Sequence, residues 1–201
     1  MNYFEGCSES RLANGLSWQN EPDSWRFIAN KLLVVPRLRT DIFRSCNGNV
    51  LDNAAVLSVP VTGNFTAITH TEVEATEFAD GSGLIVKQSF EKWFKLCLER
   101  NPWGELSTVS VVSNPWSDDC GGEIVANQGC LLRITRKGEY VGMHHSDDGS
   151  RWRFIRHFCI ELAATVRVGI LVQNPRGNAC RARFHSFEIT PEPVADFRSG
   201  E

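Results

Sequence analysis

The sequence predicts an all-β sandwich, and three observations support this prediction. Short runs rich in Val, Ile, Thr and aromatic residues recur along the chain, which is the usual composition of strands. Turn-forming residues separate these runs, as in Asn47-Gly48, Lys137-Gly138 and Asn174-Pro175-Arg176-Gly177, because Gly and Asn supply positive φ and Pro fixes φ. No helical periodicity of useful length interrupts the series, and strands at this spacing are typical of a sandwich.

The expected strands follow one another with short turns between them. In chain order they span residues 31–35, 54–61, 65–75, 83–88, 93–100, 106–113, 131–136, 140–146, 152–157, 166–172 and 181–190. No linker, repeat or low-complexity block divides the 201 residues, so we expect one domain, 1–201, with its core at roughly 15–190. The last residues, 195–201, read as a loose tail.

Composition excludes several classes of protein. Hydrophobic residues make up 42% and charged residues 22%, a normal globular balance, and the net charge of −3 argues against a nucleic-acid binder. Neither a signal sequence nor an apolar run of membrane-spanning length is visible, so no membrane association is expected. Seven cysteines at irregular spacings, without an export signal, indicate reduced thiols and a cytoplasmic location.

Alternation in the segment 93–100 gives the leading candidate site. Strand side chains alternate between two faces, so one set belongs in the core and consists of Phe94, Leu96 and Leu98. The other face then carries Trp93, Lys95 and Glu99, an aromatic residue, a cation and an anion in one row. We expect this row to lie exposed on a concave sheet face.

Several ordered segments resemble a known family. They are Trp18 with Asn20-Glu21-Pro22, Thr40-Asp41-Ile42-Phe43-Arg44, Val61-Thr62-Gly63-Asn64-Phe65, Asp80-Gly81-Ser82-Gly83, Trp93-Phe94-Lys95, Leu106-Ser107-Thr108-Val109, Ser117-Asp118, Leu132-Arg133-Ile134 and Ser146-Asp147-Asp148-Gly149. The chain resembles the concanavalin A-like sandwich family of largely unknown function, which includes the fungal regulation-of-enolase protein and bacterial proteins from sugar-utilisation operons. The resemblance implies an antiparallel, two-sheet jelly roll.

Two departures from the family pattern bear on ligand choice. The family usually reads Asp-Gln-Ala-Gly where this chain has Asp80-Gly81-Ser82-Gly83, so a polar Gln is lost. It usually reads Ser-Asp-Trp where this chain has Ser117-Asp118-Asp119, although Trp116 precedes the serine and could substitute. The ligand of the family therefore need not be the ligand of this chain.

The sequence favours a non-catalytic binding or regulatory protein. Sugars stack on aromatic rings while charged and amide groups bond their hydroxyls, and the row in 93–100 offers both kinds of group. The candidate ligand-binding residues are Trp93, Lys95, Glu99, Trp116, Asp118 and Arg133. We expect a carbohydrate or sugar-phosphate ligand, and the resemblance implies a protein partner such as enolase.

An acidic strand offers an alternative. The run Glu72-Val73-Glu74-Ala75-Thr76-Glu77 resembles the catalytic strand of laminarinase-like glycoside hydrolases. Retaining hydrolysis needs two carboxyl groups ~5 Å apart. Glu72 and Glu74 project to one face, and Glu77 joins them only if a bulge absorbs one residue. The alternative is a divergent glycoside hydrolase that uses Glu72 and Glu77.

No cofactor or metal site is expected. Cys120, Cys130, His144 and His145 match no zinc spacing, and adjacent histidines on a strand point to opposite faces. Asp147-Asp148-Gly149 reads as a hairpin turn rather than a calcium loop.

Overall fold

The computed structural model describes residues 1–201 and consists of strands joined by turns. The strands are β1 (Ser17–Gln19), β2 (Ser24–Ile28), β3 (Lys31–Val35), β4 (Ile42–Arg44), β5 (Val50–Asp52), β6 (Ala55–Thr62), β7 (Phe65–Ala75), β8 (Gly81–Lys87), β9 (Trp93–Arg100), β10 (Leu106–Ser113), β11 (Ser117–Ile124), β12 (Gly129–Lys137), β13 (Tyr140–Ser146), β14 (Arg153–Cys159), β15 (Thr165–Gln173) and β16 (Cys180–Thr190). The structure holds no helix long and apolar enough to cross a membrane.

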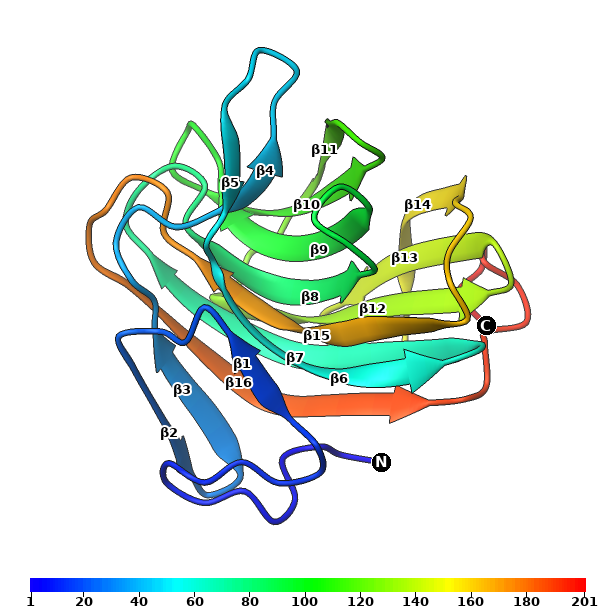
Figure 1. Cartoon of the computed structure of the whole chain (residues 1–201), viewed down its shortest axis with the longest axis horizontal. Coiled ribbons are helices and arrows are strands. Elements are labelled where there is room, and N and C mark those ends of the chain that lie inside the picture. Colours follow the sequence, from blue (N-terminus) through cyan, green and yellow to red (C-terminus); the bar gives the residue numbers. More distant parts are fainter.

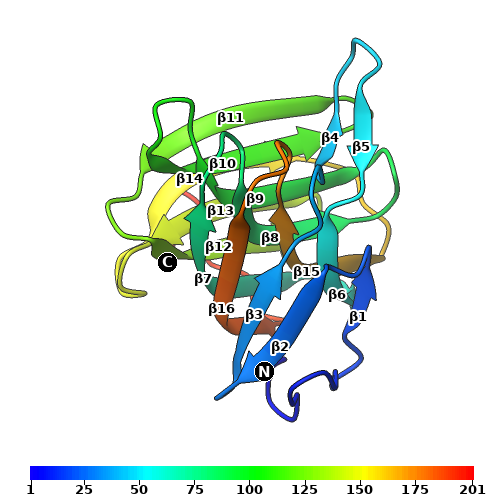
Figure 2. The same cartoon turned by 90° about the vertical axis from the view of Figure 1, so that its left-hand side faces the viewer.

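Two seven-stranded antiparallel sheets pack face to face (Figures 1 and 2). The first sheet has the order β1-β6-β15-β8-β9-β10-β11, and the second has the order β14-β13-β12-β7-β16-β3-β2. The predicted antiparallel sandwich is therefore confirmed. Each predicted segment overlaps a strand, whereas β1, β2, β4, β5 and β11 were not predicted. Three of these have only three residues, and β11 carries a polar, glycine-containing sequence without apolar alternation.

The main core lies between the sheets and contains 32 buried residues. Strand parity places Phe94, Leu96 and Leu98 of β9 in this core, as predicted. Leu132 and Ile134 of β12 face them from the second sheet. Each such side chain stabilises the fold by about 1.5–3 kcal/mol relative to its exposed state.

A second, smaller apolar cluster lies on the outer face of the first sheet. Its eight buried residues include Ile42 at the start of β4, Trp93 and Cys97 of β9, and Leu171 of β15. The hairpin formed by β4 and β5 stands beside the ends of β9, β10 and β11 (Figures 1 and 2). Arg44 fixes it there, because its backbone N–H donates to Ser117 Oγ at 2.9 Å and its Nε donates to the Pro115 carbonyl at 2.7 Å. The hairpin segment thus covers part of a sheet face that would otherwise meet solvent.

Both ends of the chain pack against the sandwich. Phe4 is fully buried in the main core, which therefore begins well before residue 15. The expectation of a loose tail at 195–201 is wrong, because Arg133 donates to the Gly200 carbonyl at 2.6 Å and the Phe197 carbonyl accepts from His144 at 2.8 Å. The Phe197 ring occupies the space over Gly142, where an added Cβ would lie 2.7 Å from it. Gly142 of β13, which has no side chain, therefore leaves room for the C-terminal segment.

Candidate functional site

The outer face of the first sheet carries a groove of about 440 Å³. Lys95 and Glu99 of β9 and Gln173 of β15 form its floor. Phe43 of β4 and Phe78, in the turn after β7, contribute aromatic walls. Arg176 lines it as well, with its guanidinium 5.6 Å from the centroid of the Phe78 ring. The groove thus combines aromatic surface with charged and amide groups.

A continuous hydrogen-bonded network runs along the groove floor. Lys95 Nζ donates to Asp41 Oδ1 at 3.1 Å and to Gln173 Oε1 at 2.7 Å. Gln173 Nε2 in turn donates to Glu99 Oε1 at 3.3 Å and to the Ala79 carbonyl at 2.9 Å. Lys95 is 1% exposed and Glu99 is 7% exposed. Buried charges are retained in proteins when they are paired in this way.

Gly81 of β8 makes this network possible. In the sheet, Gly81 pairs with Gln173 on one side and with Glu99 on the other. A Cβ at Gly81 would lie 2.5 Å from Glu99 Cγ, so only glycine leaves room for the two side chains to meet across β8. The amide group of Gln173 therefore lies beside position 81, where the family pattern quoted above usually has a Gln.

Burial and charge set the protonation states on the floor. Burial alone lowers the pKa of Lys95, but the carboxylates of Asp41 and Glu99 outweigh it and raise that pKa above its ordinary value. Burial raises the pKa of Glu99 to about 7, with Lys95 opposing the rise and Asp41 adding to it. Lys95 therefore stays charged, while Glu99 changes its protonation near neutral pH and can donate or accept a hydrogen bond.

The row of Trp93, Lys95 and Glu99 lies on the predicted side of β9, but the prediction that the row is exposed is wrong, because all three residues are buried. Trp93 is 1% exposed and packs in the second apolar cluster with Ile42. The cause is the segment leading into the β4–β5 hairpin, which lies over that end of the row. Trp93 therefore does not line the groove and offers no ring face to a ligand.

The structure separates the other proposed ligand-binding residues from the groove. Arg133 lies on the outer face of the second sheet, where its guanidinium is 4.0 Å from the centroid of the Trp152 ring. Asp118 pairs with Arg156 at 3.0 Å, while its neighbour Asp119 lines the groove. Trp116 is 48% exposed in the turn between β10 and β11 and does not line the groove.

The acidic strand also lies away from the groove. Val73 of β7 fills the main core, so Glu72 and Glu74 point outward from the second sheet. Glu77 follows the end of β7 and accepts a hydrogen bond from Asn178 at 2.7 Å. This arrangement does not favour the glycoside hydrolase alternative.

Sequence reasoning missed several groove residues. Gln173 could have been found, because it follows the core row of β15 by one position and so must face outward. Asp41 and Phe43 belong to a segment quoted for the family resemblance, but no local signal says that this segment folds over β9. Phe78 and Arg176 lie in turns, whose positions depend on long-range contacts.

The comparisons with known proteins agree with the fold. Residues 18–192 match the model of a family described as a protein of unknown function (DUF1349). Among curated protein sequences, none matches this chain. A functionally unknown protein from Saccharomyces cerevisiae is similar in structure, with a TM-score of 0.84 and 22% identity over 90% of this chain and 98% of that one.

Two sugar-related proteins share the sandwich at lower identity. The GH43 protein BlXynB from Bacillus licheniformis matches with a TM-score of 0.74 and 16% identity over 95% of this chain, but over only 39% of its own. Lectin I-B4 from Griffonia simplicifolia matches with a TM-score of 0.62 and 13% identity over 94% of this chain and 98% of that one. At such identities the likeness shows the fold alone.

Proposed function

The chain belongs to the DUF1349 family, and we propose that it is a non-catalytic binding protein whose groove takes a carbohydrate or a sugar phosphate. The observation that carries this proposal is the row of buried donors and acceptors along the groove floor. Lys95, Gln173 and Glu99 present an ammonium, an amide and a carboxyl group in a fixed order. A polyhydroxylated ring needs such an alternation of donors and acceptors.

The size and walls of the groove support the same proposal. About 440 Å³ falls within the range of sites for small molecules, roughly 300–1,000 Å³. The rings of Phe43 and Phe78 supply apolar surface for the carbon-bound hydrogens of a sugar. Arg176 is an exposed cation at the wall, so a phosphate or carboxylate on the sugar would find a partner there.

Ligand binding can be tested through two wall residues that lie outside the core. Phe78 is 45% exposed, and Arg176 is exposed, so replacing either by Ala leaves the fold intact. A panel of neutral sugars, sugar acids and sugar phosphates is screened by thermal shift and followed by calorimetry. A ligand at 100 times its Kd stabilises the native state by about 2.7 kcal/mol. We expect Phe78→Ala to weaken binding of every sugar, and Arg176→Ala to weaken only the anionic ones.

The matched control is Trp103→Ala, which removes an aromatic residue that is 83% exposed and outside the groove. Its ligand affinity should equal that of the wild type. If no member of the panel raises the melting temperature, or if the wall variants bind as tightly as the control, the carbohydrate proposal fails.

The family resemblance leads us to a second part of the proposal, which concerns a protein partner. We propose that the chain acts in the cytoplasm on a protein of sugar metabolism such as enolase. Purified enolase and the full chain are mixed and followed by sedimentation velocity, with enolase turnover measured in parallel. A faster-sedimenting complex and altered turnover are expected, and two independent boundaries with unchanged turnover would contradict it.

A further inference from the structure

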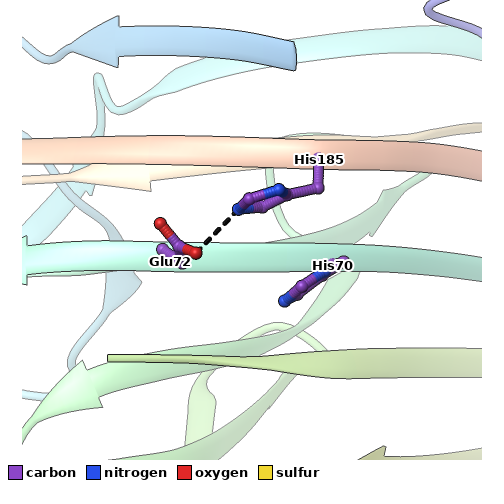
Figure 3. A group of neighbouring side chains, drawn as sticks. All are labelled: His70, Glu72 and His185. Atoms are coloured by element: carbon purple, nitrogen blue, oxygen red, sulfur yellow. Dashed lines mark ion pairs between the residues drawn. The ribbon is translucent and has the colours of Figure 1, made fainter. Parts of the chain in front are cut away.

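Three side chains of types that bind metals lie together on the outer face of the second sheet, and none of them lines the groove on the first sheet. His70 and Glu72 project from β7, and His185 projects from β16 (Figure 3). One potential ligand atom from each residue can be chosen so that all three lie within 4.8 Å of one another. All three residues are half-buried, so they are held by their surroundings but still reach solvent. The sequence alone predicted no metal site.

A β-bulge brings the third residue into place. Along β7 and β16, Thr71 pairs with Phe184 while its neighbour His70 pairs with Ser186, so His185 is an extra residue between them. Thr69 Oγ1 donates to the Ser186 carbonyl at 2.7 Å and so fixes the chain at the bulge. A β-bulge changes the direction of a side chain because it inserts one residue that has no partner on the neighbouring strand. Here the bulge places His185 beside both His70 and Glu72.

The geometry of the three side chains is compact. The two imidazole rings stack with centroids 4.3 Å apart and planes inclined by 20°. His185 Nε2 lies 2.8 Å from Glu72 Oε1. The other oxygen, Glu72 Oε2, accepts a hydrogen bond from Arg183 at 2.8 Å, which holds the carboxylate in one orientation. Such an outer partner is the usual means of orienting a metal-binding carboxylate.

From this arrangement we propose that His70, Glu72 and His185 bind one zinc-class divalent metal ion. Imidazole nitrogen and carboxylate oxygen are both zinc ligands, at about 2.0–2.2 Å from the ion. Donor atoms on one tetrahedral ion then lie roughly 3.4 Å apart, so metal binding requires the half-buried side chains of the cluster to rotate toward a common centre. Three protein ligands leave a coordination position open, as in sites where zinc keeps a water.

The surroundings define the character of the site. Lys31 and Arg183 are the nearby cations, and their positive charge opposes the binding of a divalent cation. Glu72 also lines a separate cavity of about 480 Å³ together with Arg26, Arg181 and Arg183. The proposed metal site therefore lies beside a cavity whose arginines suit a small anion.

The test uses the full chain, stripped with a chelator and titrated with zinc chloride by calorimetry. Cys46, Cys120 and Cys159 are exposed thiols that could bind zinc themselves, so all three are replaced by Ser in the reference protein. We expect one zinc ion per chain. His70→Ala and His185→Ala should each weaken binding by more than about tenfold, the lower end of the loss seen even for outer-sphere changes. His157→Ala removes an exposed histidine elsewhere and should leave the affinity unchanged.

A second measurement identifies the ligands directly. Cobalt(II) in place of zinc should give visible absorption bands without the intense thiolate-to-metal band, and histidine ring resonances of His70 and His185 should shift. If His185→Ala disturbs the bulge and fails to fold, His70→Ala and Glu72→Gln on the regular strand decide the question. The proposal is overturned if these variants bind zinc like the reference, or if zinc binding disappears when the exposed cysteines are replaced. Phe78→Ala, at the groove, should bind zinc normally, so failure here is separate from failure of the carbohydrate proposal.

Discussion

The outer faces of both sheets carry charged side chains, but these are buried on the first sheet and partly exposed on the second. On the first sheet, Lys95 and Glu99 stand in one row of β9 and are almost fully buried. On the second sheet, Glu72 and Arg183 form an ion pair of 2.8 Å whose side chains are 33% and 44% exposed. Both faces have the same strand alternation, and the difference lies in the segment that covers the first sheet.

This difference shows that strand parity determines the side of a residue but not its environment. Parity placed Trp93 and Lys95 opposite Phe94 correctly. Their burial comes from residues 40–54, a segment that lies some forty residues earlier in the chain. Charges on the covered face should therefore contribute more to stability than charges on the open face.

The largest expected effect comes from Trp93, at the covered end of the row. We expect Trp93→Ala to lower the free energy of unfolding by ~3–5 kcal/mol, the loss typical of a buried aromatic residue and similar to that of Phe94→Ala. Urea denaturation measures both. Trp103→Ala, at a residue that is 83% exposed, should change stability by less than about 0.5 kcal/mol. Equal, small effects at Trp93 and Trp103 would mean that the hairpin does not cover β9.

A smaller effect is expected when one partner of an ion pair is removed. Lys95→Met leaves Asp41 and Glu99 without their cation in a buried site, and this should destabilise the protein by about 3 kcal/mol. Arg183→Met breaks the pair with Glu72 on the open face, where at most about 1 kcal/mol is expected. The two variants are compared by denaturation in one buffer. If the second variant loses as much as the first, the contrast between the two faces is wrong.

The pH dependence of stability reports on Glu99. Its pKa is about 7 in the folded protein and 4.5 ordinarily, so the folded state holds a proton that the unfolded state has lost between these values. Stability from this group is therefore complete below pH 4.5 and is lost as the pH rises through about 7, by on the order of 3 kcal/mol. The charged or titratable groups that face Glu99 are Lys95, Asp41, Asp119 and Cys97.

The decisive comparison is with Glu99→Gln, which imitates the protonated form. Stability is measured at pH 5 and at pH 8 for both proteins, so that contributions of all other groups cancel in the difference. The wild type should lose more stability than the variant over this interval. Identical losses would show that Glu99 titrates normally and is open to solvent.

The smallest expected effect concerns the reactivity of the cysteine thiols, which tests whether the outer face of the first sheet is buried. Cys97 lies in the same row as Lys95, and burial raises its pKa well above the ordinary value. Cys159, on the edge strand β14, is exposed. A disulfide reagent should therefore modify Cys46, Cys120 and Cys159 quickly in the native protein, and all seven cysteines after denaturation without reductant. Rapid native modification of Cys97 would contradict its burial.

The sequence predicted the sandwich and the side on which each strand residue lies, because both follow from local alternation. In β9 the apolar row was assigned correctly for this reason. It did not predict that Trp93 is covered, that Gln173 reaches Glu99 across Gly81, or that His185 joins His70. Each of these depends on strand order or register, which short-range patterns do not contain. The packed tail at Phe197 was missed because its partners lie on β13 and β14.

The β4–β5 hairpin has a consequence for how such a protein can diversify. Its tip, residues 45–49, lies outside both sheets, and only its base contributes to the second apolar cluster. Lengthening a surface loop has a small entropic cost, since each doubling costs only about 0.6 kcal/mol. Sequence drift at the tip can therefore reshape one wall of the groove while the sandwich is inherited unchanged. Substitutions and insertions at the hairpin tip can therefore change ligand preference without changing the stability of the sandwich. Related proteins can acquire new ligand specificities through this one short segment.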